Sequence, residues 1–215
     1  MPDFQSRDPA DPRFWNERFA VGFTPWDEAR TPPALARFIE GERGRLGARV
    51  LVPGCGSGHE VIALAAAGFE VLAIDFAAAA VAQARRVLSP ALAQRALRQA
   101  DFFRFEHDLA EPAAQPPFDW VYERAFLPAL PPASWTAWAA RTAQLLAPGG
   151  VLAGLFYLDQ TLPERRSRPP FVTTRAELGS LLGGAFDCTA AEQLPADEVL
   201  PVFGGRLWWM VWQRR

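Results

Sequence analysis

Short apolar runs alternate with alanine-rich or amphipathic segments along most of this chain. Runs that are apolar at nearly every position predict strands buried on both faces, as in a parallel sheet that helices cover on each side. Such strands are expected at residues 49–52, 70–74, 96–100, 118–122, 151–157 and 206–213. From position 49 onward the pattern therefore predicts an α/β fold around a mostly parallel sheet.

Helices are expected between these strands, over about residues 60–67, 77–88 and 132–146. Alanine is abundant in the second of these segments, and Pro132 suits the first turn of the third. Thr174 and Glu177 have the spacing of a capping box, which predicts another helix after them. Helix and strand thus alternate through the second half of the chain as well as the first.

An aromatic segment, residues 11–40, precedes this alternation. Its aromatic side chains include Phe14, Trp15, Phe19, Phe23 and Trp26. We expect two short helices here, which either cover a site as a lid or plug the core with their rings. At this length one domain is expected over residues 1–215, with an aromatic lid over 1–45 and the core over 46–215.

Composition narrows the classes of function. The chain has 22 Lys plus Arg against 24 Asp plus Glu, so no basic footprint for nucleic acid is expected. Two Cys and two His are too few for a disulfide framework or a metal site. No secretory signal or membrane span is expected, because the N-terminus is polar and charges interrupt the most apolar region. We expect a cytoplasmic protein that acts on a small molecule; its oligomeric state is not predicted.

A glycine triplet, Gly54, Gly56 and Gly58, lies between the first expected strand and helix. Missing side chains let the backbone turn tightly and let a ligand approach the main-chain amides. A dinucleotide fingerprint would need glycine at His59, whereas the G-x-G-x-G spacing favours S-adenosylmethionine. A purely structural turn is the alternative interpretation.

Acidic residues follow three of the expected strands, at the edge of the sheet where ligands usually bind. Asp75 is placed to accept hydrogen bonds from the ribose hydroxyls of a cofactor, with Phe76 beside it, or to cap the next helix. Asp101 is a candidate for the adenine amino group, with Phe102 stacking nearby, and Glu123 for the ammonium of the methionine moiety. The alternative for Asp101 and Glu123 is a solvated position in a loop.

Several motifs together resemble the thiopurine S-methyltransferase superfamily, especially its thiocyanate, halide and thiol methyltransferase branch. They are Trp15 and Phe19 before Thr24-Pro25-Trp26-Asp27, the loop from Leu51 to Val61, Asp75, Phe118-Asp119, Leu146 to Gly150, and Pro169-Pro170-Phe171. The resemblance implies a Rossmann-like class I methyltransferase fold with a mostly parallel seven-stranded sheet, helices on both faces and an N-terminal helical lid. It also implies cofactor contacts by Trp15, Trp26, Gly54, Asp75, Asp101 and Glu123. Phe19 stands where the plant-type proteins carry tryptophan.

The expected reaction is an in-line displacement at a sulfonium methyl group, for which the protein must align and desolvate the reactants. Trp15 and Trp26 are expected to close over the cofactor and favour its charge by about 0.5 to 2 kcal/mol. Arg124 either attracts a soft anion or forms a surface ion pair. By resemblance Tyr157 points its hydroxyl at the acceptor; otherwise it packs in the core.

The expected acceptor is a thiol, thiocyanate, a halide or a related sulfur or selenium compound. Two other readings of the chain stay open at this point. One is a protein that binds S-adenosylmethionine without catalysis, and the other, which the loop spacing disfavours, is a nicotinamide-dependent oxidoreductase.

Overall fold

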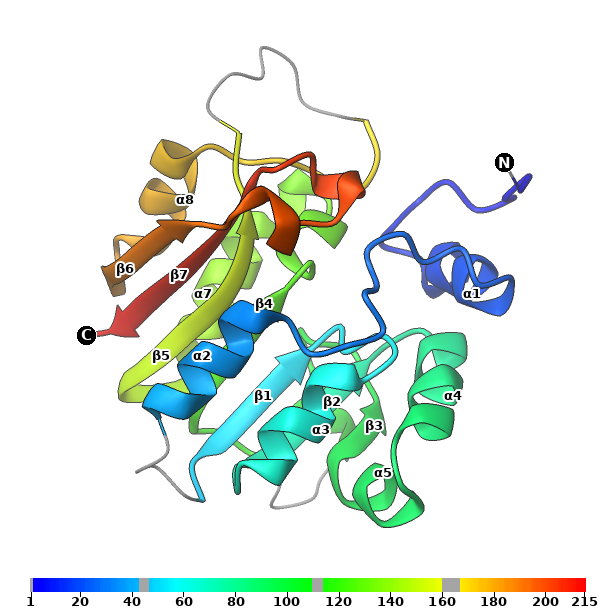
Figure 1. Cartoon of the computed structure of the whole chain (residues 1–215), viewed down its shortest axis with the longest axis horizontal. Helices are drawn as coiled ribbons and strands as arrows, with labels where there is room; N and C mark the ends of the chain where they lie inside the picture. The colour runs from blue at the N-terminus through cyan, green and yellow to red at the C-terminus, as the bar shows by residue number, and fades with distance from the viewer. Residues whose placement is uncertain (1, 43–46, 110–113, 160–166) are drawn as a thin grey trace.

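The computed structural model describes residues 2–42, 47–109, 114–159 and 167–215. In this part of the chain a seven-stranded sheet has the order β3-β2-β1-β4-β5-β7-β6 (Figure 1). Its strands are β1 (Arg49–Pro53), β2 (Glu70–Asp75), β3 (Leu97–Gln99), β4 (Phe118–Arg124), β5 (Leu146–Tyr157), β6 (Phe186–Gln193) and β7 (Leu207–Arg214). Neighbours from β3 to β5 are parallel, and β7 is antiparallel to β5 and β6. The expected mostly parallel seven-stranded sheet is confirmed.

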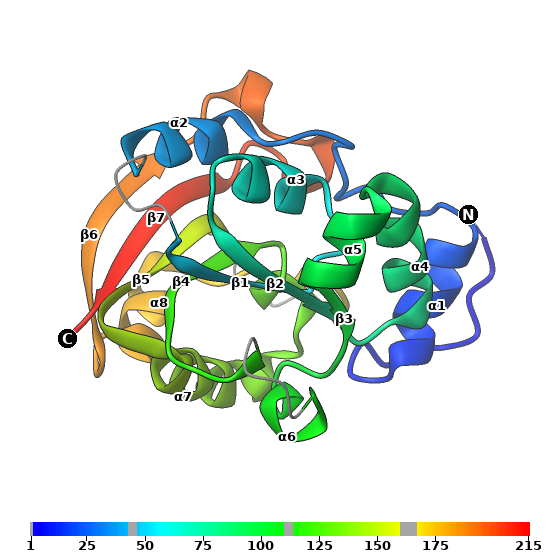
Figure 2. The ribbon, with the colours of Figure 1, turned by 90° about the horizontal axis from the view of Figure 1, so that it is seen from below.

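Helices cover both faces of this sheet (Figure 2). They are α1 (Pro12–Ala20), α2 (Pro33–Gly41), α3 (His59–Ala66), α4 (Ala78–Val87), α5 (Pro90–Ala96), α6 (Phe105–Leu109), α7 (Trp135–Leu145) and α8 (Arg175–Leu182). Figure 2 shows α2, α3 and α5 on one face and α6, α7 and α8 on the other. None of the helices in the described ranges is both long and apolar enough to cross a membrane.

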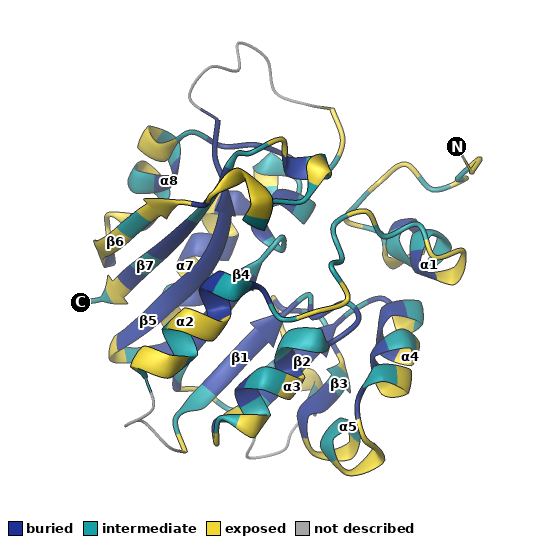
Figure 3. Cartoon of the chain, viewed as in Figure 1, coloured by how far each residue is buried: buried dark blue, intermediate teal, exposed yellow. Residues whose placement is uncertain are grey.

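Two apolar clusters hold the layers together, because side chains alternate between the faces of a strand. Val50 and Val52 of β1 pack in the cluster under α2 and α3, whereas Leu51 packs in the cluster under α7 and α8. All three are at most 4% exposed. Figure 3 shows the same contrast between buried central strands and exposed outer helix faces.

The second N-terminal helix, α2, belongs to the core. Leu35 is fully buried, and the Phe38 ring lies 4.8 Å from Trp120 and 5.3 Å from Trp209, measured between centroids. Within the expected lid over residues 1–45, α2 therefore packs against the sheet. Residues 1 and 43–45 of that range lie outside the described part of the chain.

The first helix, α1, is docked against α4 at the carboxyl edge of the sheet. Pro12 occupies its first turn, and Asp11 caps it by accepting a hydrogen bond from the Arg13 amide at 2.9 Å. Asn16 accepts a hydrogen bond from the Ala79 amide at 2.8 Å. Because that amide belongs to the first turn of α4, Asn16 caps one helix from the other and fixes their relative position.

Candidate active site

The glycine loop between β1 and α3 has the backbone conformation that its sequence predicts. Gly54, Gly56 and Gly58 have φ values of 58°, 53° and 77°, a region that favours glycine. A Cβ atom at Gly54 would lie 2.5 Å from Cδ2 of Phe126, and one at Gly56 would lie 3.6 Å from the Phe19 ring. The loop therefore runs close to aromatic groups on two sides.

Asp75, the last residue of β2, lies directly beside this loop. Its carboxylate accepts hydrogen bonds from the Gly56 amide at 3.1 Å and the Ala77 amide at 2.9 Å. Burial raises the pKa of Asp75 to about 6, although both hydrogen bonds act in the opposite direction. The side chain thus links the loop to Ala77, the N-cap residue of α4, without itself capping the helix, and it also lines the cavity described next.

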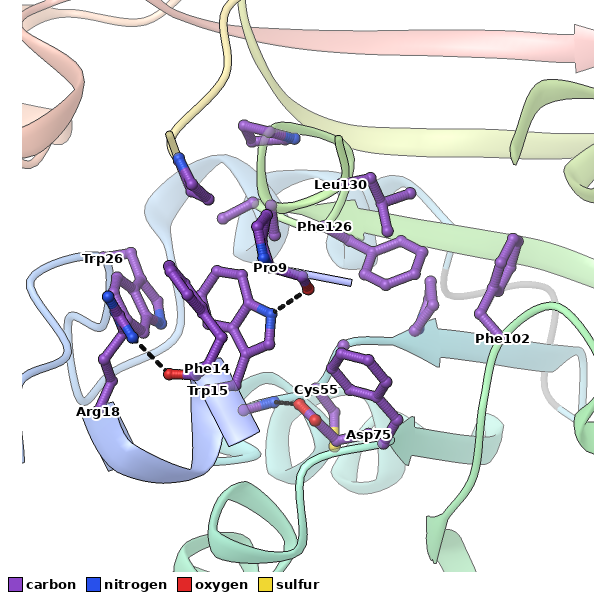
Figure 4. Close-up of a pocket in the computed structure, with 18 of the residues that line it drawn as sticks. Pro9, Phe14, Trp15, Arg18, Trp26, Cys55, Asp75, Phe102, Phe126 and Leu130 are labelled. Carbon is purple, nitrogen blue, oxygen red and sulfur yellow. Dashed lines mark hydrogen bonds between the residues drawn. The ribbon is translucent and has the colours of Figure 1, made fainter. Parts of the chain in front are cut away.

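A cavity of about 1260 Å³ opens at this edge of the sheet. Figure 4 shows the rings of Trp15, Phe126 and Phe102 gathered around it, with Cys55 and Asp75 at its base. The expected site residues on its wall are Trp15, Phe19, Trp26, Gly54, Gly56, Asp75, Phe76, Asp101, Phe102 and Arg124. The structure thus brings these positions, which are far apart in the sequence, into one site.

The aromatic residues from the N-terminal segment form one side of the cavity. Trp15 and Trp26 meet edge to face with 5.5 Å between centroids, and Phe19 lies 6.0 Å from Trp26. The Trp15 indole donates a hydrogen bond to the Pro9 carbonyl at 2.9 Å (Figure 4). Trp15 and Trp26 are half-buried, as expected for rings that combine packing with access to a ligand.

Asp101 and Phe102 lie on the wall after β3. The Asp101 side chain accepts a hydrogen bond from the Phe103 amide at 3.0 Å, which fixes the turn that carries it. Phe102 is 4% exposed, and its ring centroid lies 5.1 Å from that of Phe126. This pair joins the wall after β3 to the wall after β4.

Arg124, at the end of β4, was expected either to attract a soft anion or to form a surface ion pair, and it lies in a buried ionic cluster. Its Nη2 lies 3.1 Å from a Glu28 oxygen, and its Nε lies 3.3 Å from a Glu60 oxygen. The three side chains are 12%, 3% and 13% exposed for Arg124, Glu28 and Glu60. Two carboxylates therefore face one guanidinium, so Arg124 does not present an uncompensated positive charge to an anion.

Glu123 does not line the cavity, contrary to the position that the resemblance implies. It points to the opposite face of β4, where it accepts hydrogen bonds from the Phe126 amide at 2.9 Å and the Leu127 amide at 3.0 Å. Its other oxygen, Oε2, is buried without a hydrogen-bond partner among the described residues. Burial raises the pKa of Glu123 to about 8. The side chain closes the turn in which Ala125 adopts a φ of 57°.

Gly58 and Tyr157 are also absent from the cavity wall. Gly58 precedes α3, and a Cβ atom there would lie 3.3 Å from the Ala84 side chain, so its role is in packing α3 against α4. Tyr157 is 2% exposed and packs against Phe203 with 5.4 Å between centroids. Its environment is the core that the alternative interpretation describes.

Sequence reasoning gave no role to Tyr122, Glu60 and Phe126, which line the cavity, or to Glu28, which pairs with Arg124 away from the cavity wall. Tyr122 lies on the cavity wall, and its hydroxyl is buried without a hydrogen-bond partner among the described residues. The two-residue period of β4, which places it on the same face as Arg124, is the signal that would have found it. Glu60 was inside the recognised loop motif, whereas no local pattern pointed to Glu28.

The donor set of this cavity fits S-adenosylmethionine. The loop brings backbone groups into the open because side chains are missing at Gly54 and Gly56. The wall also has a carboxylate, that of Asp75, with the oxygen acceptors that ribose hydroxyls need, and the rings of Trp15 and Trp26, whose π faces would suit a sulfonium.

Comparison with known proteins identifies the family of this chain. Residues 10–206 match the family model described as thiopurine S-methyltransferase. A probable thiol methyltransferase 2 from Arabidopsis thaliana is 32% identical, over 78% of this chain and 70% of that protein. A thiopurine S-methyltransferase from Vibrio cholerae is 32% identical, over 81% of this chain and 82% of that protein.

Two solved structures with the same fold are methyltransferases. A Burkholderia thailandensis 1,6-didemethyltoxoflavin-N1-methyltransferase with bound S-adenosylhomocysteine has a TM-score of 0.69 and 18% identity, and the match covers 99% of this chain and 93% of that one. A Synechocystis magnesium protoporphyrin IX methyltransferase with bound S-adenosylmethionine has a TM-score of 0.68 and 16% identity, with 98% and 99% covered. The chain belongs to the thiopurine S-methyltransferase family and is an S-adenosylmethionine-dependent S-methyltransferase.

Proposed function

We propose that this enzyme transfers a methyl group from S-adenosylmethionine to the sulfur of a small, uncharged and largely apolar thiol. One observation carries the proposal: the cavity continues past the glycine loop to an apolar wall, while the only guanidinium described at the end of β4 is already paired with two carboxylates. The names of relatives, which include thiol, thiocyanate and thiopurine methyltransferases, support a sulfur acceptor.

The loop side of the cavity is the proposed cofactor site. Asp75 would accept hydrogen bonds from the ribose, and Asp101 with Phe102 would bind the adenine. Trp15 and Trp26 would cover the sulfonium, whose charge their ring faces favour by about 0.5 to 2 kcal/mol. Phe19 and Phe76 would complete this aromatic surround. The cofactor supplies an electrophilic methyl group to the acceptor.

The other side of the cavity is the proposed acceptor site. Its wall is mostly apolar and comes from the segments after β4, before α8 and before β7. Its apolar residues include Phe126, Pro128, Leu130, Pro170 and Phe203, and Arg168 also lines this part of the cavity. A volume of about 1260 Å³ exceeds the usual range of about 300 to 1,000 Å³ for ligand pockets, which suits two ligands side by side.

The charge balance near Arg124 favours a neutral acceptor over an anion. Glu28 also pairs with Arg30 at 3.1 Å, so with both glutamates ionised the cluster of Arg124, Arg30, Glu28 and Glu60 has no net charge and offers an anion no unpaired guanidinium. Thiocyanate or iodide would gain little attraction there, whereas a thiol enters without charge. The protein then contributes mainly by aligning the reactants and excluding water.

Release of S-adenosylhomocysteine with a panel of acceptors tests this proposal. The panel is benzyl mercaptan, 6-mercaptopurine, thiocyanate and iodide, at equal concentrations and neutral pH. Benzyl mercaptan should give the largest kcat/KM. If thiocyanate or iodide gives the largest value, the acceptor assignment is wrong. If S-adenosylhomocysteine binds tightly but no acceptor is methylated, the chain is a binding protein without this catalysis.

A further inference from the structure

Glu60 has a position that the proposed function does not yet use. It lies in the first turn of α3, and its carboxylate is 3.3 Å from Arg124 Nε while its side chain lines the cavity. Glu28 pairs with the same guanidinium but is absent from the cavity wall. Glu28 also pairs with Arg30, so of the two carboxylates that hold Arg124 only that of Glu60 is within reach of a molecule in the cavity.

The surroundings of Glu60 raise the pKa of its carboxyl group and so favour its acting as a base. Burial raises its pKa above the ordinary value, Asp27 raises it further, and Arg124 and His59 lower it. These groups approach from the N-terminal segment, from β4 and from α3 itself, and the Tyr122 hydroxyl lies on the same side of β4 as Arg124. A buried carboxylate with a raised pKa is a better base than a solvated one.

A neutral thiol needs such a base. A thiol resembling the cysteine side chain has a pKa of about 8.5, so most of it is protonated at neutral pH, yet the thiolate is the nucleophile. Halides and thiocyanate have no proton to lose. The requirement for a base therefore separates the thiols from the other acceptors of this family's reactions.

We propose that Glu60 accepts the proton of the thiol acceptor as the sulfur attacks the methyl group. This inference rests on the proposed function. The S–H bond breaks and its proton goes to the Glu60 carboxylate, while the electron pair on sulfur forms the new bond to the methyl carbon. The bond from that carbon to the donor sulfur breaks, and its electron pair leaves with neutral S-adenosylhomocysteine. Glu60 then releases the proton to water.

Two unused hydrogen-bond donors lie beside Glu60. Arg124 Nη1 and the Tyr122 hydroxyl are buried without hydrogen-bond partners among the described residues, and both side chains line the cavity. Burial raises the pKa of Tyr122 well above its usual value, so its hydroxyl keeps its proton. These donors are suited to stabilise the negative charge that develops on sulfur as Glu60 takes the proton.

Glu60→Gln, measured with benzyl mercaptan and with iodide, tests the proposal. The kcat/KM for benzyl mercaptan should fall at least about 100-fold, the range of a general base, while that for iodide changes by less than about threefold. Glu28→Gln is the control, because it removes the other carboxylate that pairs with Arg124, away from the cavity wall, together with its pair with Arg30. It should leave the ratio of the two kcat/KM values within about threefold of the unchanged protein.

The pH profile and binding provide independent measurements. In the unchanged protein the benzyl mercaptan rate should rise with pH and level off once Glu60 is ionised. In Glu60→Gln it should keep rising tenfold per pH unit towards the pKa of the free thiol, about 8.5 or higher. In calorimetry, Glu60→Gln should bind S-adenosylhomocysteine with the same dissociation constant as the unchanged protein. Glu60→Asp, which keeps a carboxylate, should retain part of the thiol rate that Glu60→Gln loses.

An equal loss with both acceptors, or an unchanged thiol rate in Glu60→Gln, would overturn the role of Glu60. If iodide is no acceptor at all, the change in the thiol pH profile decides alone. If the unchanged protein methylates iodide but no thiol, the proposed function is wrong, and the role of Glu60, which rests on it, is wrong as well.

Discussion

Replacing Glu123 by glutamine should stabilise the protein at alkaline pH without weakening cofactor binding. The side chain is 1% exposed, and one of its oxygens accepts two amide hydrogen bonds that an amide oxygen can also accept. The substitution therefore keeps the turn after β4 closed and removes a buried negative charge.

The size of the effect follows from the pKa of Glu123, which burial raises from 4.5 to about 8. Below pH 4.5 the carboxyl group is protonated in both the folded and the unfolded protein. Between these two pKa values only the unfolded chain loses the proton, so the free energy of unfolding falls by about 1.4 kcal/mol per pH unit. Above pH 8 the loss is complete, at about 5 kcal/mol. Glutamine escapes this loss.

Urea unfolding of both proteins between pH 5 and pH 9, followed by tryptophan fluorescence, measures the difference directly. Other titrating groups, such as Asp75, are common to both proteins and cancel in the difference. The advantage of Glu123→Gln should grow with pH and level off above about pH 8. A difference that is constant from pH 5 to pH 9 would refute the raised pKa. A tenfold weaker affinity for S-adenosylhomocysteine would instead place Glu123 in the cofactor site.

Three further substitutions test the cavity and its aromatic cover. Gly54→Ala should weaken S-adenosylhomocysteine binding at least tenfold in calorimetry, since its Cβ would lie 2.5 Å from a Phe126 ring atom. Gly47→Ala is the control for backbone strain, because Gly47 also has a positive φ but its Cβ would meet nothing within 4 Å, and it should leave binding unchanged. Asn16→Ala should lower the free energy of unfolding in urea by about 1 kcal/mol, because it uncaps α4, and it should raise the KM for S-adenosylmethionine. An unchanged KM would show that the docking of α1 does not affect cofactor binding. Trp26→Ala should remain folded by circular dichroism and lower kcat as well as raise KM, because a ring that aligns and desolvates the reactants acts in the transition state; a change in KM alone would contradict this.

The central sheet could be predicted from sequence because its inner strands are buried on both faces and read as continuous apolar runs. The edge strand β6 could not, since most of its side chains are exposed and it carries no such run. The start of β5 was also placed too late, because Pro148, Gly149 and Gly150 are typical of a turn yet lie within the strand.

The edge of the sheet that holds the site was predictable, but the direction of individual side chains was not. Asp75 and Asp101 follow strands and reach the cavity, whereas Glu123 turns to the other face of β4. Its neighbours Tyr122 and Arg124 point into the cavity instead. The pairing of Arg124 with Glu28 joins residues 96 positions apart, and no local pattern encodes such a contact.

The location of the methyl group after one reaction tests the account most directly. The enzyme is incubated with S-adenosylmethionine carrying a trideuterated methyl group, in the presence of benzyl mercaptan and of amine, phenol and carboxylate acceptors of similar size. Mass spectrometry should find the label on the thiol sulfur, in an amount equal to the S-adenosylhomocysteine released. Label on nitrogen or oxygen, or S-adenosylhomocysteine released without a labelled thioether, would contradict it.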